Sequence, residues 1–231
     1  FVLAAVLVAR LPRARPCGPE RSAPRLSAGG LRSVLRMPAV AAALVVALVA
    51  ATAQGIFVVL FIVFVARRLG GGPAEIGLLR GVQAVGAIAG GTLLATRGDR
   101  WRPIVLAAAA AIAFGVIDMT IWNGPMVTRA EAVYAALFVC AGAPGVIMET
   151  AGISFLQAAG EDGERGRVFA ALGLVENAGQ ALGIALAGVL TAPLGLMALL
   201  NAQGTLYLAA GAVVVGLGRR ARPSRIPAVY S

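Results

Sequence analysis

Five side chains capable of chemistry stand inside long apolar stretches of this chain. Two are carboxylates and three are cationic or amide groups: Glu149, Glu176, Arg80, Gln54 and Gln180. Ionisable groups inside membrane-spanning segments are costly, face protein or water, and mark transport or proton pathways by default. A carboxylic acid in apolar surroundings favours its neutral form, so it can bind and release a proton near neutral pH. We therefore take Glu149 and Glu176 as candidates for proton coupling, with the other three as candidates for the same transport site.

Each of these candidates also has a purely structural interpretation. Either carboxylate could hydrogen-bond a neighbouring helix or pair with an arginine from another part of the protein. Arg80 could instead extend its guanidinium group to the membrane surface. The pair Pro144 and Gly145 interrupts the hydrogen-bond ladder of its own stretch and predicts a bent helix. Such a bend could serve as a hinge or have no function.

The composition places these residues in a membrane protein. The chain has 231 residues, of which 59% are hydrophobic and 13% charged, whereas about a quarter of a soluble protein is charged. All twenty basic residues are arginines, and all but Arg80 lie between the apolar stretches, without the stacking aromatic residues of a nucleic-acid interface. Two separated cysteines and no histidine give no basis for a metal site or a disulfide framework. We expect a lipid bilayer as partner, no nucleic acid, and no metal or cofactor.

Six apolar stretches are long enough to cross a bilayer, which takes about 17–25 residues of helix. They span roughly residues 39–66, 76–96, 103–122, 131–157, 168–190 and 195–217. They lack the strict alternation and ten-residue length of barrel strands. The sequence predicts an all-α polytopic membrane protein with a six-helix bundle over 39–217. Residues 1–9 are apolar and are interpreted as the end of a truncated transmembrane helix.

The arginines predict the orientation, because cytoplasmic loops collect positive charge. Sixteen arginines fall in segments that would share one side, and three fall on the other. Residues 10–38, a central loop, and residues 218–231, a tail, are therefore expected in the cytoplasm, with the chain in the plasma (inner) membrane.

The short turn "TRGDRWRP" at 96–103 contains an acid that the orientation rule does not explain. A carboxylate between guanidinium groups at a helix end can pin two helices together. The turn resembles the cytoplasmic loop motif Gly-x-x-x-Asp-Arg-x-Gly-Arg-Arg of the major facilitator superfamily. Asp99 and Arg100 match that motif, Ala95 replaces its first glycine, and Arg102 and Pro103 depart from it. The resemblance implies that Asp99, Arg100 and Arg102 belong to a cytoplasmic gate.

A second stretch, residues 155–190, resembles the loop between the tenth and eleventh helices of superfamily exporters of the macrolide and siderophore type. The residues in the corresponding places are Gln157, Arg165, Gly166, Arg167 and Val168. The resemblance covers about 39–217 as the second half of such a transporter, whose first half would precede it in the same polypeptide. It implies a secondary transporter that works by alternating access, with proton-coupled efflux of small amphipathic molecules by antiport.

The resemblance also implies a division of labour among the six spans. The first and fourth would line the cavity, the second and fifth would pack against the other half, and the third and sixth would face lipid. The polar residues follow this division, because the third and sixth spans carry theirs near their outer ends. Two small-residue spacings, Gly86-x-x-x-Gly90 and Gly179-x-x-x-Gly183, lie on the second and fifth spans, where they allow close helix approach.

Two other classes of protein compete with the transporter. A membrane enzyme is disfavoured because the chain has no histidine, Ser154 is not in a Gly-x-Ser-x-Gly motif, and no phosphate-binding loop is present. We therefore predict that the chain is not an enzyme. A non-transporting membrane protein, such as a sensor or a decayed half-permease, stays open at this point.

Overall fold

The computed structural model of the chain describes residues 34–159 and 164–220, with the side chains of residues 99 and 217–220 left out. Its helices are α3 (Pro38–Phe64), α4 (Pro73–Arg97), α5 (Pro103–Asn123), α6 (Glu131–Ala159), α7 (Arg165–Leu194) and α8 (Leu196–Arg220). Short helical segments η1 (Val65–Leu69), η2 (Gly98–Arg100) and η3 (Gly124–Met126) follow α3, α4 and α5. The described part is all-α and contains no strand. The predicted helix end at 1–9, most of the central loop and residues 221–231 lie outside it.

The six helices correspond one to one to the six predicted spans, and all six are long and apolar enough to cross a membrane. This confirms the predicted all-α six-helix bundle and fits a multi-pass membrane protein. The predicted link between the fifth and sixth spans is wrong, because α7 continues through Pro193 to Leu194. Gly195 alone separates α7 from α8, and its φ of 84° is a left-handed conformation that glycine adopts without strain.

Proline marks the start of three of the helices. Pro38, Pro73 and Pro103 each occupy the first position, where the missing N–H is not needed and the fixed φ suits a helix. At α4 the backbone N–H of Gly72 also donates a hydrogen bond to the Glu75 carboxylate, at 2.7 Å. These local signals fix where the chain leaves each turn and enters the next span.

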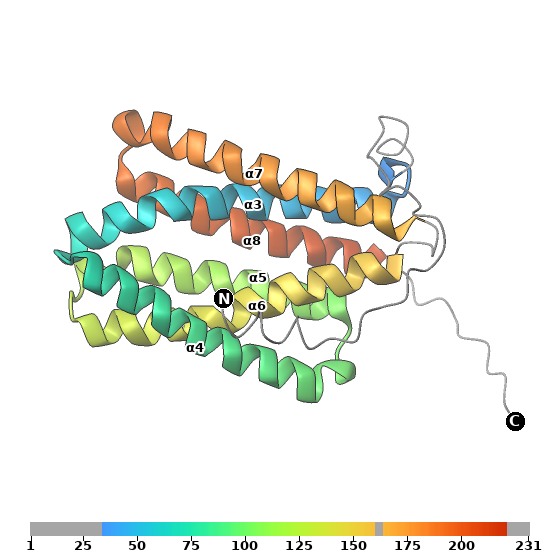
Figure 1. Cartoon of the computed structure of the whole chain (residues 1–231), viewed down its shortest axis with the longest axis horizontal. Coiled ribbons are helices and arrows are strands. Elements are labelled where there is room, and N and C mark those ends of the chain that lie inside the picture. Colours follow the sequence, from blue (N-terminus) through green and yellow to red (C-terminus); the bar gives the residue numbers. More distant parts are fainter. Residues whose placement is uncertain (1–33, 160–163, 221–231) are drawn as a thin grey trace, which may run out of the picture.

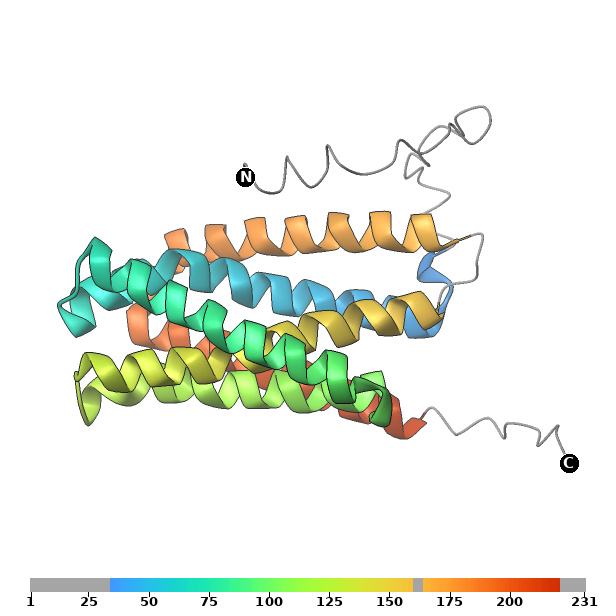
Figure 2. The ribbon, with the colours of Figure 1, turned by 60° about the horizontal axis from the view of Figure 1, so that its bottom comes forward.

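The helices pack in the order α7, α3, α8, α5, α6 and α4, each against the next. Figure 1 shows α7, α3 and α8 on one side of the bundle and α5, α6 and α4 on the other, whereas in the direction of Figure 2 α8 lies close to α5 and away from α7. Contacts of α8 with α5, and smaller ones of α3 with α6, join the two groups. The links α3–α4, α5–α6 and α7–α8 lie at one end of the bundle, and α4–α5 and α6–α7 at the other (Figure 1).

Glycines allow two of these helix pairs to touch backbone to backbone. A Cβ atom added at Gly183 of α7 would overlap the Thr52 carbonyl oxygen and lie 2.9 Å from the Gly55 Cα of α3. On α4, a Cβ at Gly90 would lie 2.6 Å from the Ala143 Cα of α6. The glycine spacings on α4 and α7 therefore do permit close approach, and their partners are α6 and α3.

Two buried clusters fill the end of the bundle where α3 ends and α4 begins. The first is aromatic, with ring centroids 4.9–6.2 Å apart among neighbours, and includes Phe57, Phe61, Phe64, Trp122, Tyr134 and Phe138. The second is polar and lies between α5 and α8. There Trp122 Nε1 donates to Gln203 Oε1 at 2.9 Å, and Gln203 Nε2 donates to Asp118 Oδ2 at 2.7 Å. Because all three side chains are buried, these hydrogen bonds hold α5 to α8.

Candidate functional site

A cavity of about 760 Å³ lies between the helices and is lined by residues of all six. All five candidates chosen by residue type line it: Gln54, Arg80, Glu149, Glu176 and Gln180. Most of the remaining lining is apolar, with alanine the commonest residue. An apolar cavity of this size with a few polar groups is the usual form of a site for a small organic molecule.

The cavity occupies the half of the bundle that ends at the α4–α5 and α6–α7 links. Most of its lining comes from residues 43–54 of α3, 104–114 of α5, 142–156 of α6, 172–180 of α7 and 207–214 of α8, which lie toward those links, whereas α4 contributes residues 80–87 from its middle. The aromatic cluster fills the opposite half. Access from the end that carries the α4–α5 and α6–α7 links therefore does not require the aromatic cluster to open.

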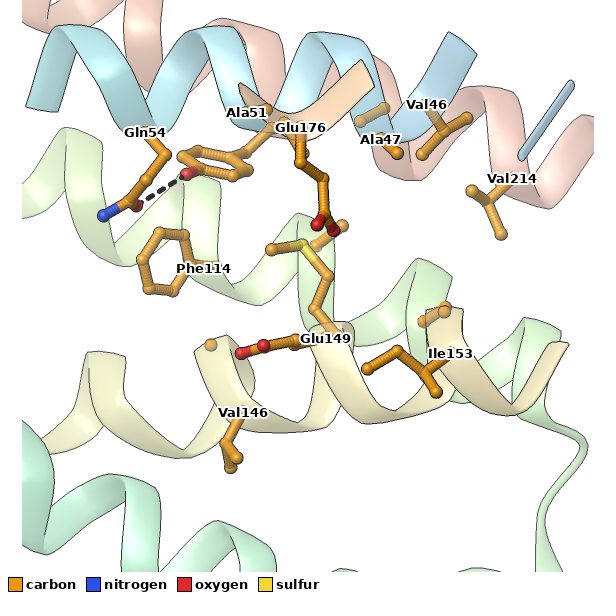
Figure 3. Close-up of a pocket in the computed structure, with 18 of the residues that line it drawn as sticks. Val46, Ala47, Ala51, Gln54, Phe114, Val146, Glu149, Ile153, Glu176 and Val214 are labelled. Carbon is orange, nitrogen blue, oxygen red and sulfur yellow. Dashed lines mark hydrogen bonds between the residues drawn. The ribbon is translucent and has the colours of Figure 1, made fainter. Parts of the chain in front are cut away.

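Glu149 of α6 and Glu176 of α7 reach into the cavity from opposite walls (Figure 3). Both side chains are exposed rather than packed against a neighbouring helix. Within residues 34–159 and 164–220, neither carboxylate has a hydrogen-bond partner or an arginine at salt-bridge distance. The hydrogen bond to a neighbouring helix, one of the two structural interpretations, is therefore not made by the described residues. The two carboxylates are available to a proton or to a ligand.

Arg80 of α4 lies over two aromatic rings of α3. Its guanidinium carbon is 4.6 Å from the Phe57 ring centroid and 5.2 Å from that of Phe61. Its Nη1 donates a weak hydrogen bond to Gln83 Oε1, at 3.4 Å. A guanidinium group at this distance from a ring face is attracted by the negative face of the π system. The positive charge of Arg80 is therefore held against the aromatic cluster, at the inner limit of the cavity.

Two lining residues were missed by the sequence analysis, because they lie on spans expected to face lipid. Tyr207 of α8 is buried and its hydroxyl donates to Gln54 Oε1 at 3.3 Å (Figure 3). Phe114 of α5 packs edge-on against the Tyr207 ring, with centroids 4.8 Å apart. A tyrosine inside an apolar span was the available signal, since its hydroxyl requires a partner when buried. Together these residues orient the Gln54 amide and give the cavity an aromatic wall.

Of the two predicted hinge residues, Pro144 and Gly145, only Gly145 lies on the cavity wall. Helix α6 runs through Pro144 and Gly145 without interruption. Gly145 lines the cavity, and a Cβ there would come within 3.3 Å of the Phe114 ring. The hinge itself stays a prediction.

The two stretches that resemble transporter loop motifs lie outside the cavity but at the same end of the bundle. Arg100 belongs to η2 and Arg102 precedes α5, and both side chains are exposed. The Asp99 side chain lies outside the described set, so its pairing with a basic group stays a prediction. The second motif places Gln157 in the last turn of α6 and three residues, all exposed, in the first turn of α7: Arg165, Gly166 and Arg167.

Arg167 makes a surface contact within its own turn. Its Nη1 lies 3.4 Å from Glu164 Oε1. An exposed pair of this kind contributes little stability.

Within the described ranges, no group of three or more histidine, cysteine or acidic residues could hold a metal ion. Comparison with protein-family models and with curated proteins gives no match to this chain.

Proposed function

We propose that this chain is the C-terminal six-helix half of a secondary transporter of the major facilitator type, which exports small amphipathic molecules by proton-coupled alternating access. The observation that carries the proposal is the cavity that gathers all five sequence candidates. A first half of the same polypeptide would complete the translocation path. The arginine-rich end would face the cytoplasm across the plasma (inner) membrane.

The cavity lining supports a small amphipathic substrate. Alanines and the Phe114 ring offer apolar surface, and Gln54 and Gln180 offer amide groups. Such a mixture binds molecules that are partly apolar and partly polar.

The two carboxylates support proton coupling. Glu149 and Glu176 project into a shared space, and neither is neutralised by a described arginine. An acid in such a position can be protonated in one step of a transport cycle and deprotonated in another, as a coupled antiport requires. A structural role through a hydrogen bond to a neighbouring helix would have left them paired within the described residues; pairing with an arginine of the first half is the structural alternative that the double variant below tests.

The arginine distribution supports the orientation. The cavity lies toward the links that carry Arg97, Arg100, Arg102, Arg165 and Arg167. With positive charge on the cytoplasmic side, the cavity would receive its substrate from the cytoplasm, which is the direction of an exporter.

Everted membrane vesicles from cells that express the complete gene product test this function. A proton gradient is imposed and the uptake of three probes is followed: ethidium as a cation, chloramphenicol as a neutral molecule and fluorescein as an anion. We expect gradient-dependent uptake of at least one probe above that of vesicles without the protein, and its collapse on adding a protonophore. Equal uptake of all three probes with and without the protein would contradict the proposal and favour a non-transporting membrane protein.

A further inference from the structure

The negative charges that face the cavity are more available to a ligand than the positive one. Two carboxylates and one guanidinium line it. The guanidinium of Arg80 already rests on the Phe57 and Phe61 rings. Glu149 and Glu176 have no comparable partner among the residues described, so the unsatisfied charge of the cavity is negative.

The two carboxylates also have a geometry suited to one guest. They come from α6 and α7 and enter the cavity from opposite walls (Figure 3). A positively charged group placed between them would be attracted by both, since each attraction grows as the group leaves bulk water. A negatively charged group at the same place would be repelled by both.

The surroundings of the carboxylates suit an apolar body rather than a hydrated metal ion. Met148 of α6 is adjacent to Glu149 and lines the cavity. Figure 3 shows Ile153 of α6 and the Phe114 ring near the carboxylates. Methionine is polarizable and adapts its shape to a guest. The volume of about 760 Å³ leaves room for several rings, since sites for drug-sized molecules run from about 300 to 1,000 Å³.

We propose that the cavity binds a monovalent organic cation with an apolar body, whose charged group sits between Glu149 and Glu176. The two carboxylates select ligands by their charge, and the wall at Phe114 selects them by the size of their apolar body. Arg80, held on its aromatic rings, limits how far a cation enters. This inference rests on the proposed function for its role in transport, but binding can be measured without transport.

A pair of isosteric ions tests the inference. Tetraphenylphosphonium and tetraphenylborate have nearly the same shape and opposite charges, so apolar contacts alone would bind them similarly. The protein in lipid nanodiscs is titrated with each ion by calorimetry, with empty nanodiscs as the blank. We expect saturable binding of the phosphonium and at least tenfold weaker binding of the borate.

Single substitutions test which carboxylates attract the cation. Glu149→Gln and Glu176→Gln should each weaken phosphonium binding by about tenfold, the effect of one charged interaction, and the double variant by more. Glu131→Gln is the matched control, because this exposed glutamate begins α6 outside the cavity lining and its loss changes the net charge equally. Arg80→Gln should tighten phosphonium binding, because it removes a positive charge that repels a cation at the inner limit of the cavity. A thermal unfolding midpoint for each variant shows that the fold is retained.

The outcomes separate this inference from the proposed function. Equal binding of the two ions, binding of neither, or a folded double variant with wild-type affinity would overturn the cation site. Gradient-driven transport of a neutral or anionic probe alone would then leave the transporter standing. Phosphonium binding lost in the double variant, with no transport of any probe, would support the cation site and remove the transporter.

Discussion

Replacing Gly183 with alanine should separate α7 from α3 and weaken the wall that carries Glu176. A Cβ atom at this position meets only backbone: it overlaps the Thr52 carbonyl oxygen and lies 2.9 Å from both the Gly55 Cα and the Ile56 nitrogen. Backbone atoms of a packed helix cannot rotate away as a flexible side chain can. The two helices must therefore move apart by roughly one ångström to restore ordinary van der Waals contact.

Two effects of opposite sign determine how much Gly183→Ala changes the free energy of unfolding. Overpacking of this kind costs about 1–3 kcal/mol. Alanine in place of glycine inside a helix returns roughly 1 kcal/mol through its higher helix propensity. Gly188→Ala, on the same helix, has the second effect alone, because nothing lies within 4 Å of a Cβ there. The difference between the two variants therefore isolates the helix contact, and we expect Gly183→Ala to be less stable by about 1–3 kcal/mol.

Thermal unfolding of the two variants in lipid nanodiscs, followed by tryptophan fluorescence, measures this difference. For a chain of this length, 1 kcal/mol corresponds to roughly 2–4 °C in the midpoint. Gly183→Ala should unfold roughly 2–12 °C below Gly188→Ala. A Gly183→Ala midpoint equal to or above that of Gly188→Ala would refute the close α3–α7 contact, and with it the position of Glu176 in the cavity.

Two further predictions address the interior and the orientation. Gln203→Leu leaves the buried Asp118 carboxyl and Trp122 N–H without hydrogen-bond partners. This loss should destabilise the bundle by about 3 kcal/mol and lower its unfolding midpoint by roughly 6 °C or more. An unchanged midpoint would contradict the hydrogen bonds that hold α5 to α8. In a variant without native cysteines, a cysteine at the exposed Val127 should react with an impermeant thiol reagent added to intact cells, while one at Ser224 should not. The reverse labelling would invert the orientation.

The six spans could be predicted because a membrane-spanning helix requires a long apolar stretch of sequence. The residues at which the spans end were harder to predict. "TAPLG" has the composition of a loop, yet α7 continues through Pro193, because a single glycine with positive φ is enough to reverse the chain. The close α3–α7 and α4–α6 contacts could be anticipated as spacings, but their partners are set by three-dimensional packing.

The residues of the candidate site could be predicted from the sequence, but their arrangement in space could not. Polar residues inside apolar spans must face protein or water rather than lipid, so Glu149 and Glu176 could be selected by residue type. That Arg80 rests on rings of α3 depends on how α3 and α4 approach one another, which the sequence does not state. Tyr207 was missed because α8 was expected to face lipid, whereas part of it backs the cavity.

The central claim is that carboxylates of this cavity couple proton movement to transport. The most direct test reconstitutes the complete gene product in proteoliposomes and imposes a pH gradient. Accumulation of whichever probe is transported in vesicles is then compared between the wild type and the Glu149→Gln, Glu176→Gln double variant. We predict that the wild type accumulates the probe against its gradient, with a rate that depends on pH, and that the double variant does not. A double variant that still accumulates the probe uphill with the wild-type pH dependence would contradict the claim and place the proton site outside this cavity.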